Sequence, residues 1–291
     1  MELDCGVWLS LGGFHERGRD WPTTQRIYNC HALLDPAGHL VAAYRKTHLC
    51  DVELEGRVTM KESSFTNPGT EIVPPVSTPA GKLGLSICYD LRFPEISLAL
   101  RRAGAEILTY PSAFTVPTGS AHWEVLLRAR AIESQCYVVA AAQTGKNHER
   151  RTSYGHALVV DPWGAVVAQC REGPGLCYAE IDLDYLHRIR QEIPVHGHRR
   201  PGLTSMAGWR RLQGWQRCRE PLAGTVKSRA GPRPLCFRPF LPKTQQQDAL
   251  RAPPSPCAAA RRVSPLFFGV PPKPLHCCGG AGAEGRSQAL Q

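Results

Sequence analysis

A cysteine lies where a buried strand is expected to turn into a helix. Residues 83–87 (Leu-Gly-Leu-Ser-Ile) have the composition of a buried strand, Cys88 follows them, and Pro94 opens a predicted helix over 94–103. A sulfur at such an elbow lies beside the N–H groups that open the helix, which favour a thiolate and can hold an oxyanion. The pattern is typical of nucleophilic catalysis, but an inert buried cysteine fits the spacing equally well.

A second candidate is Lys46, in the run Tyr44-Arg45-Lys46-Thr47-His48-Leu49 that ends an apolar strand. A catalytic cysteine needs one group that takes its proton and another that stabilises the charge on the attacked carbonyl. Lys46 suits the second role. Most lysines at strand ends are simply solvated, so this residue alone does not decide between catalysis and a surface position.

Four motifs together resemble the nitrilase superfamily of carbon–nitrogen hydrolases, in order and in spacing. They are Tyr44–Leu49, Ile87–Glu95, Tyr110–Phe114, and Gly155-His156 followed by Asp161-Pro162-Trp163-Gly164. The resemblance covers about residues 5–200. It implies an α/β (α+β layered) fold, a four-layer α-β-β-α sandwich, with a Glu–Lys–Cys triad that cleaves non-peptide amide or nitrile bonds through a thioester.

Carried onto this chain, the resemblance makes Cys88 the nucleophile and Lys46 the cation that stabilises the oxyanion. The family's second glutamate falls on Glu62, in Met60-Lys61-Glu62-Ser63, where it would orient substrate or lysine, and Tyr89 is a supporting neighbour of the nucleophile. The implied substrate is a small α-keto-acid amide such as deaminated glutathione. No cofactor and no metal are implied, and family members form homo-oligomers.

The family's general base is a glutamate that follows a proline on an early strand, ahead of the segment that matches Val7–Leu11. The only Pro-Glu pair in this sequence is Pro94-Glu95, which belongs to the cysteine elbow. We therefore expect the sandwich to be incomplete at its N-terminus and amide hydrolysis to be impaired. The alternative function is that of a non-catalytic truncated isoform that associates with full-length subunits.

Short apolar runs alternate with helical patterns over residues 1–200, which predicts one layered domain. The turns Asp35-Pro36-Ala37-Gly38 and Asp161-Pro162-Trp163-Gly164 each predict a β-hairpin. A second helix is predicted over Ala121–Gln135. The predicted strands are Val7–Leu11, Tyr28–Leu34, Leu40–Arg45, Leu83–Cys88, Glu106–Tyr110, Tyr137–Ala142, Ala157–Val160, Ala165–Ala168 and Cys177–Ile181.

The net charge of +10 belongs to residues 201–291, which hold 14 Lys and Arg against 3 Asp and Glu, while residues 1–200 are nearly neutral. That segment also carries 13 of the 25 prolines, so it is predicted to be a mostly disordered basic tail in which Leu266–Phe268 is apolar enough to dock. RNA or anionic-lipid binding by the tail is a weaker alternative, and we expect neither a nucleic-acid nor a membrane partner.

The twelve cysteines include no Cys-x-x-Cys pair, and neither a signal-peptide pattern nor an apolar run of membrane-spanning length occurs in the sequence. The expectation is reduced thiols and a cytoplasmic location, with a mitochondrial one possible for full-length forms. His196-Gly197-His198 and Cys277-Cys278 lack a paired second motif, so a metal site is not predicted.

Overall fold

The computed structural model describes residues 6–54, 58–149, 151–204 and 266–269 of the 291-residue chain. These residues divide between two compact units. The main unit runs to His196 and includes residues 266–269, whereas the second unit begins at Gly197 and contains the short helix α5 (Pro201–Thr204). Most of the predicted basic tail, with Cys277-Cys278, lies outside the described residues.

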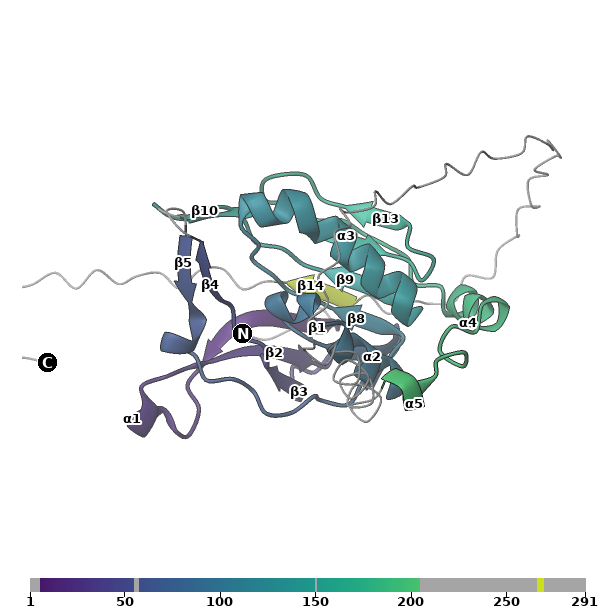
Figure 1. Ribbon diagram of the computed structural model, residues 1–291, viewed down its shortest axis with the longest axis horizontal. Coiled ribbons are helices and arrows are strands. Elements are labelled where there is room, and N and C mark those ends of the chain that lie inside the picture. Colours follow the sequence, from purple (N-terminus) through teal and green to yellow (C-terminus); the bar gives the residue numbers. More distant parts are fainter. Residues whose placement is uncertain (1–5, 55–57, 150, 205–265, 270–291) are drawn as a thin grey trace, which may run out of the picture. The chain divides into compact units, whose positions relative to one another are not determined.

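The main unit contains a six-stranded sheet in the order β13-β12-β9-β8-β7-β6 (Figure 1). Strands β7, β8 and β9 at its centre are parallel, and their neighbours are antiparallel. In sequence order the strands are β6 (Val76–Thr78), β7 (Gly81–Leu85), β8 (Ile107–Thr109), β9 (Tyr137–Ala140), β12 (Leu158–Val160) and β13 (Val166–Gln169). The central strands β8 and β9 are buried along their whole length, as is typical of parallel strands covered on both faces.

A second sheet has the order β14-β1-β2-β3. Its strands are β1 (Trp8–Glu16), β2 (Tyr28–Leu34), β3 (Leu40–Arg45) and β14 (Leu266–Gly269). Two small hairpins stand apart from both sheets, and their strands are β4 (Asp51–Leu54), β5 (Val58–Lys61), β10 (Thr144–His148) and β11 (Arg151–Tyr154).

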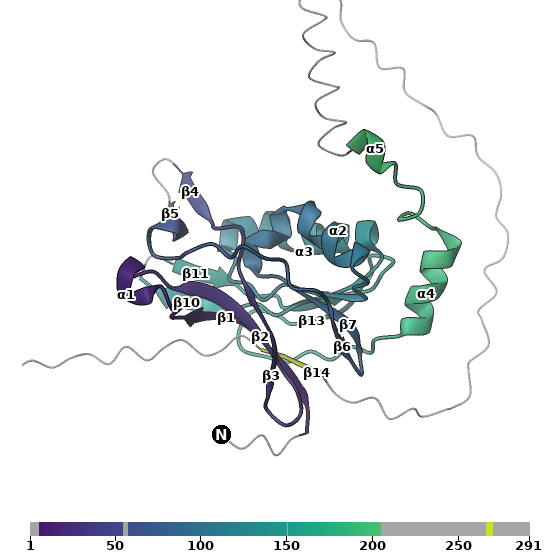
Figure 2. The ribbon, with the colours of Figure 1, turned by 90° about the horizontal axis from the view of Figure 1, so that it is seen from below.

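Helices and sheets form layers within the main unit. Figure 2 shows α2 (Pro94–Arg102) and α3 (Val116–Ser134) on one side of the six-stranded sheet, with β1, β2 and β3 on the other. These are three of the four layers expected of the α-β-β-α sandwich. The helix α4 (Leu183–Glu192) lies at one end of the six-stranded sheet, where Arg190 donates to the carbonyls of Ala105 and Gln135. Among the described helices, which also include the four-residue α1 (Trp21–Thr24), none is long and apolar enough to cross a membrane.

Both predicted hairpins are confirmed. Gly38 and Gly164 have φ of +83° and +95°, and each donates its N–H to the carbonyl of the aspartate that opens its turn. The Asp35 and Asp161 carboxylates also accept backbone N–H groups within the turns. The turns join β2 to β3 and β12 to β13 in antiparallel pairs because a residue with positive φ lets the chain reverse.

Other boundaries differ from the sequence prediction. Helix α3 begins at Val116, five residues before the predicted start, because Pro117 suits the first helical turn. The predicted strand Cys177–Ile181 is wrong, since these residues pair with no strand and lead directly into α4, where the Asp182 side chain caps the helix by accepting the Tyr185 N–H. The hairpins β4–β5 and β10–β11 were both missed by the sequence prediction. The strands β10 and β11 are polar and lack an apolar pattern, whereas β4 and β5 alternate apolar with polar residues and pair Val52 with Met60 and Leu54 with Val58.

The strand β14 comes from the region predicted to be a tail. Residues Leu266–Gly269 pair in parallel with Trp8–Leu11 of β1. They occupy the side of β1 that faces away from β2, and a strand edge left without a partner would expose a row of unpaired backbone groups. The apolar run that was expected to dock therefore does so as an edge strand of the β1–β3 sheet.

Candidate active site

The elbow that carries Cys88 is a short 3₁₀ turn, η2 (Cys88–Arg92), between β7 and α2. Cys88 is half-buried and has a φ of +46°, a left-handed conformation that is strained for a residue other than glycine. Its N–H donates to the Pro111 carbonyl at 3.0 Å. The sulfur was expected beside the N–H groups that open the helix, but α2 begins only at Pro94, six residues after Cys88, and the Cys88 amide already has an acceptor.

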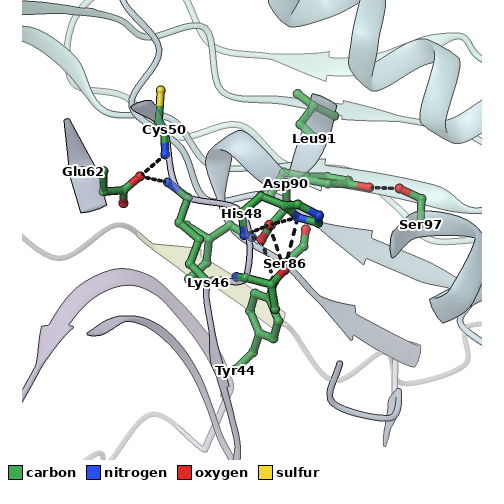
Figure 3. A network of polar contacts seen from close by, with 12 residues as sticks. Tyr44, Lys46, His48, Cys50, Glu62, Ser86, Asp90, Leu91 and Ser97 are labelled. Atoms are coloured by element: carbon green, nitrogen blue, oxygen red, sulfur yellow. Dashed lines mark hydrogen bonds and ion pairs between the residues drawn. The ribbon is translucent and has the colours of Figure 1, made fainter. Parts of the chain in front are cut away.

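Lys46 and Glu62 form a buried ion pair. Lys46 directly follows β3, its side chain is 3% exposed, and its Nζ lies 2.5 Å from Oε2 of Glu62. Glu62 begins the 3₁₀ turn η1 (Glu62–Ser64), and its carboxylate also accepts the Cys50 N–H at 2.7 Å (Figure 3). Two residues that are 16 positions apart in the sequence are thus held together in a nearly water-free place.

The charge on Lys46 is maintained against its burial. Burial lowers the pKa of a lysine, but the negative charges of Cys88, Glu62 and Asp90 outweigh that effect and raise the pKa of Lys46 above its ordinary value. The geometry places the two residues in one region, because the Lys46 Nζ lies 5.9 Å from the ring of Tyr89, the residue that follows Cys88. A thiolate and a buried ammonium are the two charges that an attack on an amide carbonyl requires.

Asp90, which the sequence prediction missed, connects the Cys88 elbow to the loop that follows Lys46. Its buried carboxylate accepts the Tyr44 hydroxyl at 2.7 Å, the Ile87 N–H at 2.9 Å and the His48 N–H at 3.1 Å. His48 Nδ1 also lies 2.8 Å from Oδ1 of Asp90 (Figure 3). Asp90 thus holds the loop that follows Lys46 against the elbow. Its position two residues after Cys88 was the signal in the sequence that could have identified Asp90.

Tyr89 lies where a supporting residue was predicted. Its ring centroid is 5.9 Å from the Lys46 Nζ and 5.7 Å from the guanidinium carbon of Arg92, and its edge meets the ring of Phe93. The Arg92 guanidinium also lies 5.4 Å from the Phe114 ring centroid. This part of the site combines aromatic faces with two cations.

Two buried side chains on other elements also reach the elbow. Arg130 of α3 is 5% exposed and donates to the Leu91 carbonyl at 3.0 Å. His31 of β2 lies with its Nδ1 3.0 Å from the Ser86 carbonyl. Neither contact is visible in the sequence, because the partners are 39 and 55 residues apart.

No group of three or more His, Cys, Asp or Glu side chains able to hold a metal ion occurs among the described residues. An open depression of about 500 Å³ lies beside the end of β13, and its lining residues are His156, Gln169, Cys170, Arg171 and Glu172. None of these residues belongs to the cluster around Lys46. The groups that the described residues place around the Cys88 elbow include an ammonium, a guanidinium, carboxylates and aromatic rings.

The sequence profile of the carbon–nitrogen hydrolase family matches residues 3–191. Among the relatives, deaminated glutathione amidase of Mus musculus is 68% identical over 208 residues, which are 72% of this chain and 64% of that protein. The Homo sapiens deaminated glutathione amidase has the same identity and the same coverage. The chain thus spans a little less than two thirds of the length of these relatives.

Solved structures give the same result for the fold. The NitFhit protein of C. elegans is 56% identical and superposes with a TM-score of 0.65, over 68% of this chain and 48% of that one. Nit3 of Saccharomyces cerevisiae, described as a member of the nitrilase superfamily, is 36% identical with a TM-score of 0.56, over 66% of each chain. An amidase of Nesterenkonia, 26% identical over 64% of this chain and 68% of its own with a TM-score of 0.52, carries acrylamide added at its active-site cysteine.

Proposed function

Because the chain belongs to the carbon–nitrogen hydrolase family, we propose that it is a thiol amidase of the nitrilase superfamily with Cys88 as its nucleophile and Lys46 as its oxyanion-stabilising cation. One observation carries this proposal. The buried Lys46–Glu62 pair lies near a strained cysteine elbow, since the Lys46 Nζ is 5.9 Å from the ring of Tyr89, the residue that follows Cys88. An inert core cysteine needs no such neighbour.

The reaction follows from this arrangement. The Cys88 sulfur attacks the amide carbonyl carbon, and the electron pair of the C=O bond moves to the oxygen, where the Lys46 ammonium stabilises the oxyanion. Collapse of this intermediate breaks the carbon–nitrogen bond, and the amine leaves with the proton that the Cys88 thiol gave up. Water then attacks the resulting thioester, releases the acid and restores the thiol. Glu62 orients the Lys46 ammonium throughout, because it holds Nζ at 2.5 Å.

The proton of Cys88 needs an acceptor. The carboxylates of Glu62 and Asp90 are both engaged, the first by Lys46 and the Cys50 N–H, and the second by Tyr44, His48 and Ile87. Among the described residues, no hydrogen bond joins the Cys88 thiol to either carboxylate. We therefore expect the residues of this sequence to hydrolyse amides slowly, since loss of a general base typically costs about 10²–10⁴-fold in rate.

The proposed substrate is a small α-keto-acid amide such as deaminated glutathione. Two relatives at 68% identity are named for deaminated glutathione, which supports this choice. The Arg92 guanidinium, close to the rings of Tyr89 and Phe114, adds a second cation beside Lys46 that suits a substrate bearing a carboxylate. The proposed role is therefore metabolite repair by amide hydrolysis.

The test compares the purified chain with Cys88→Ser and Lys46→Met. Deaminated glutathione is the substrate, and mass spectrometry measures both the released acid and any acyl group bound to Cys88. We expect slow turnover and a covalent adduct in the unaltered chain, with neither in Cys88→Ser. Turnover that persists unchanged in Cys88→Ser would show that another group is the nucleophile.

A second candidate function is that of a non-catalytic chain that associates with full-length subunits. It is favoured by apolar side chains exposed together, since Val125 and Ile132 lie seven residues apart along α3 and are 67% and 50% exposed. Trp163, 55% exposed, belongs to the turn whose Gly164 lies against Ile132. Co-expression with a full-length relative, followed by size-exclusion chromatography, should then give a mixed oligomer, and recovery of only the free chain would contradict this candidate.

A further inference from the structure

Three residues form a row across the β1–β3 sheet and face the Cys88 elbow. Gly12 of β1 is paired with His31 of β2, and His31 is paired in turn with Tyr44 of β3. Directly paired residues of antiparallel strands point to the same face of a sheet. The three residues contact Pro111, Ser86 and Asp90, which surround Cys88 in the chain or accept its N–H, so one face of the sheet packs against the backbone around Cys88.

His31, at the centre of the row, is completely buried and makes two hydrogen bonds. Its Nδ1 lies 3.0 Å from the Ser86 carbonyl, and a carbonyl can only accept, so Nδ1 carries the proton. Its Nε2 then accepts from the Ser10 hydroxyl at 2.7 Å. The ring is thus held in one tautomer, and its donor fixes the backbone two residues before Cys88.

The outer members of the row contact the other two segments. The Tyr44 hydroxyl donates to Oδ2 of Asp90 at 2.7 Å, two residues after Cys88. Gly12 lies so close to Pro111 that a Cβ atom would overlap the proline ring. The carbonyl of Pro111 is the acceptor of the Cys88 N–H.

Cys88 itself needs such support. Left-handed backbone conformations outside glycine are strained and persist only where the surroundings enforce them. The row contacts the residue two before Cys88, the residue two after it and the acceptor of its N–H. Three contacts from one sheet therefore hold the backbone around Cys88, whose φ is +46°.

We propose that the row Gly12–His31–Tyr44 is a positioning element for Cys88, and that His31 is its central positioning residue. This inference rests on the proposed amidase function, in which the sulfur must lie beside Lys46. His31 touches neither substrate nor sulfur. It acts through Ser86, and loss of its hydrogen bond lets the elbow relax and moves the sulfur away from the ammonium.

The experiment uses the full chain and four variants: His31→Leu, His31→Asn, Tyr44→Phe and Leu186→Ala. Asparagine keeps an N–H donor near the position of Nδ1, whereas leucine removes both hydrogen bonds. Leu186 is fully buried on α4, which contacts the backbone before β8 and β9, at the opposite end of the parallel strands from Cys88. Its truncation therefore destabilises the fold without touching the elbow.

Three measurements are made on each chain: the melting temperature, the iodoacetamide alkylation rate of each cysteine by peptide mass spectrometry, and kcat and KM for deaminated glutathione. Slower alkylation of Cys88 reports displacement from Lys46, because the thiolate is the reacting form. Cys30, buried in β2, and Cys50 serve as internal controls, since general loosening of the fold would accelerate their alkylation.

We expect His31→Leu to slow Cys88 alkylation about tenfold and to lower kcat by about 10–100-fold, as a misplacement of about 1 Å typically does. Tyr44→Phe should have a smaller effect in the same direction, and His31→Asn should restore most of the Cys88 rate. An equal loss in Leu186→Ala at a matched melting temperature, or an unchanged Cys88 rate in His31→Leu, would overturn the proposal. No turnover in any chain, with this alkylation pattern intact, would overturn the amidase function while supporting the positioning role.

Discussion

Acid should destabilise this protein through His31. The imidazole is completely buried, and burial lowers its pKa from an ordinary 6.5 to about 4, although the Ser86 carbonyl partly opposes that shift. In the unfolded chain the same imidazole binds a proton below about pH 6.5. A group whose pKa is depressed by folding contributes stability that is fully present above its unfolded pKa. That contribution is lost as the pH falls towards the folded pKa.

The size of the effect follows from the two pKa values. Linkage between proton binding and folding gives a loss of about 2 kcal/mol at pH 5 and about 3 kcal/mol at pH 4, relative to pH 7.5. A typical domain is stable by only about 5–15 kcal/mol, so such a loss is easily measured. His31→Leu lacks the titrating group and should show none of this component, whatever its stability at neutral pH.

The assay is urea unfolding followed by tryptophan fluorescence at pH 7.5, 6 and 5, for the unaltered chain and for His31→Leu. Carboxylates titrate in both chains, so the difference between the two pH dependences isolates His31. We expect the unaltered chain to lose about 2 kcal/mol more than the variant between pH 7.5 and pH 5. Parallel curves for the two chains would show that His31 is not held neutral by burial.

Three further predictions concern other contacts. Glu62→Gln leaves the Lys46 ammonium buried without its charged partner. It should lower the free energy of unfolding by about 3–5 kcal/mol in urea titrations. The matched control is Glu124→Gln, which removes an exposed ion pair and should lower the free energy of unfolding by less than about 1 kcal/mol. Gly12→Val should lower both the melting temperature and the alkylation rate of Cys88, because the valine side chain would overlap the ring of Pro111. A variant as stable as the unaltered chain would contradict the close approach of Gly12 to Pro111. Deletion of residues 263–291 removes β14 and leaves one edge of β1 without a paired strand. The shortened chain should associate through this edge, as a concentration-dependent elution volume in size-exclusion chromatography would show. A shortened chain that stays monomeric at all concentrations would contradict this prediction.

Some features of the protein follow from the sequence alone, because their causes are local. The turns at Asp35–Gly38 and Asp161–Gly164 were predictable, since an aspartate that accepts nearby N–H groups and a glycine at positive φ act within four residues. The strand before Cys88 and the helix after it were likewise encoded in an apolar run and a proline. Motif order then indicated the family.

Other features depend on chain segments that meet only in the folded protein. The contact of Lys46 with Glu62 joins the end of β3 to the turn after β5, whereas the sequence resemblance left open whether Glu62 orients the substrate or Lys46. The roles of Asp90 and His31 could be assigned only once the register between the strands was known. The register decides which face of a sheet each side chain occupies. The partner of β1 lies about 250 residues away, in a segment whose composition predicted disorder.

The difference between the two groups is physical. Turns and helix starts are determined by residues that are neighbours in the sequence, so their conformational preferences can be inferred from the residue types alone. The surroundings of Cys88 are determined by the packing of one sheet against another, so a histidine on β2 could be recognised as the support of the elbow only after the sheets were in place. The sequence by itself therefore determined the candidate nucleophile, whereas the tertiary structure decided what holds it.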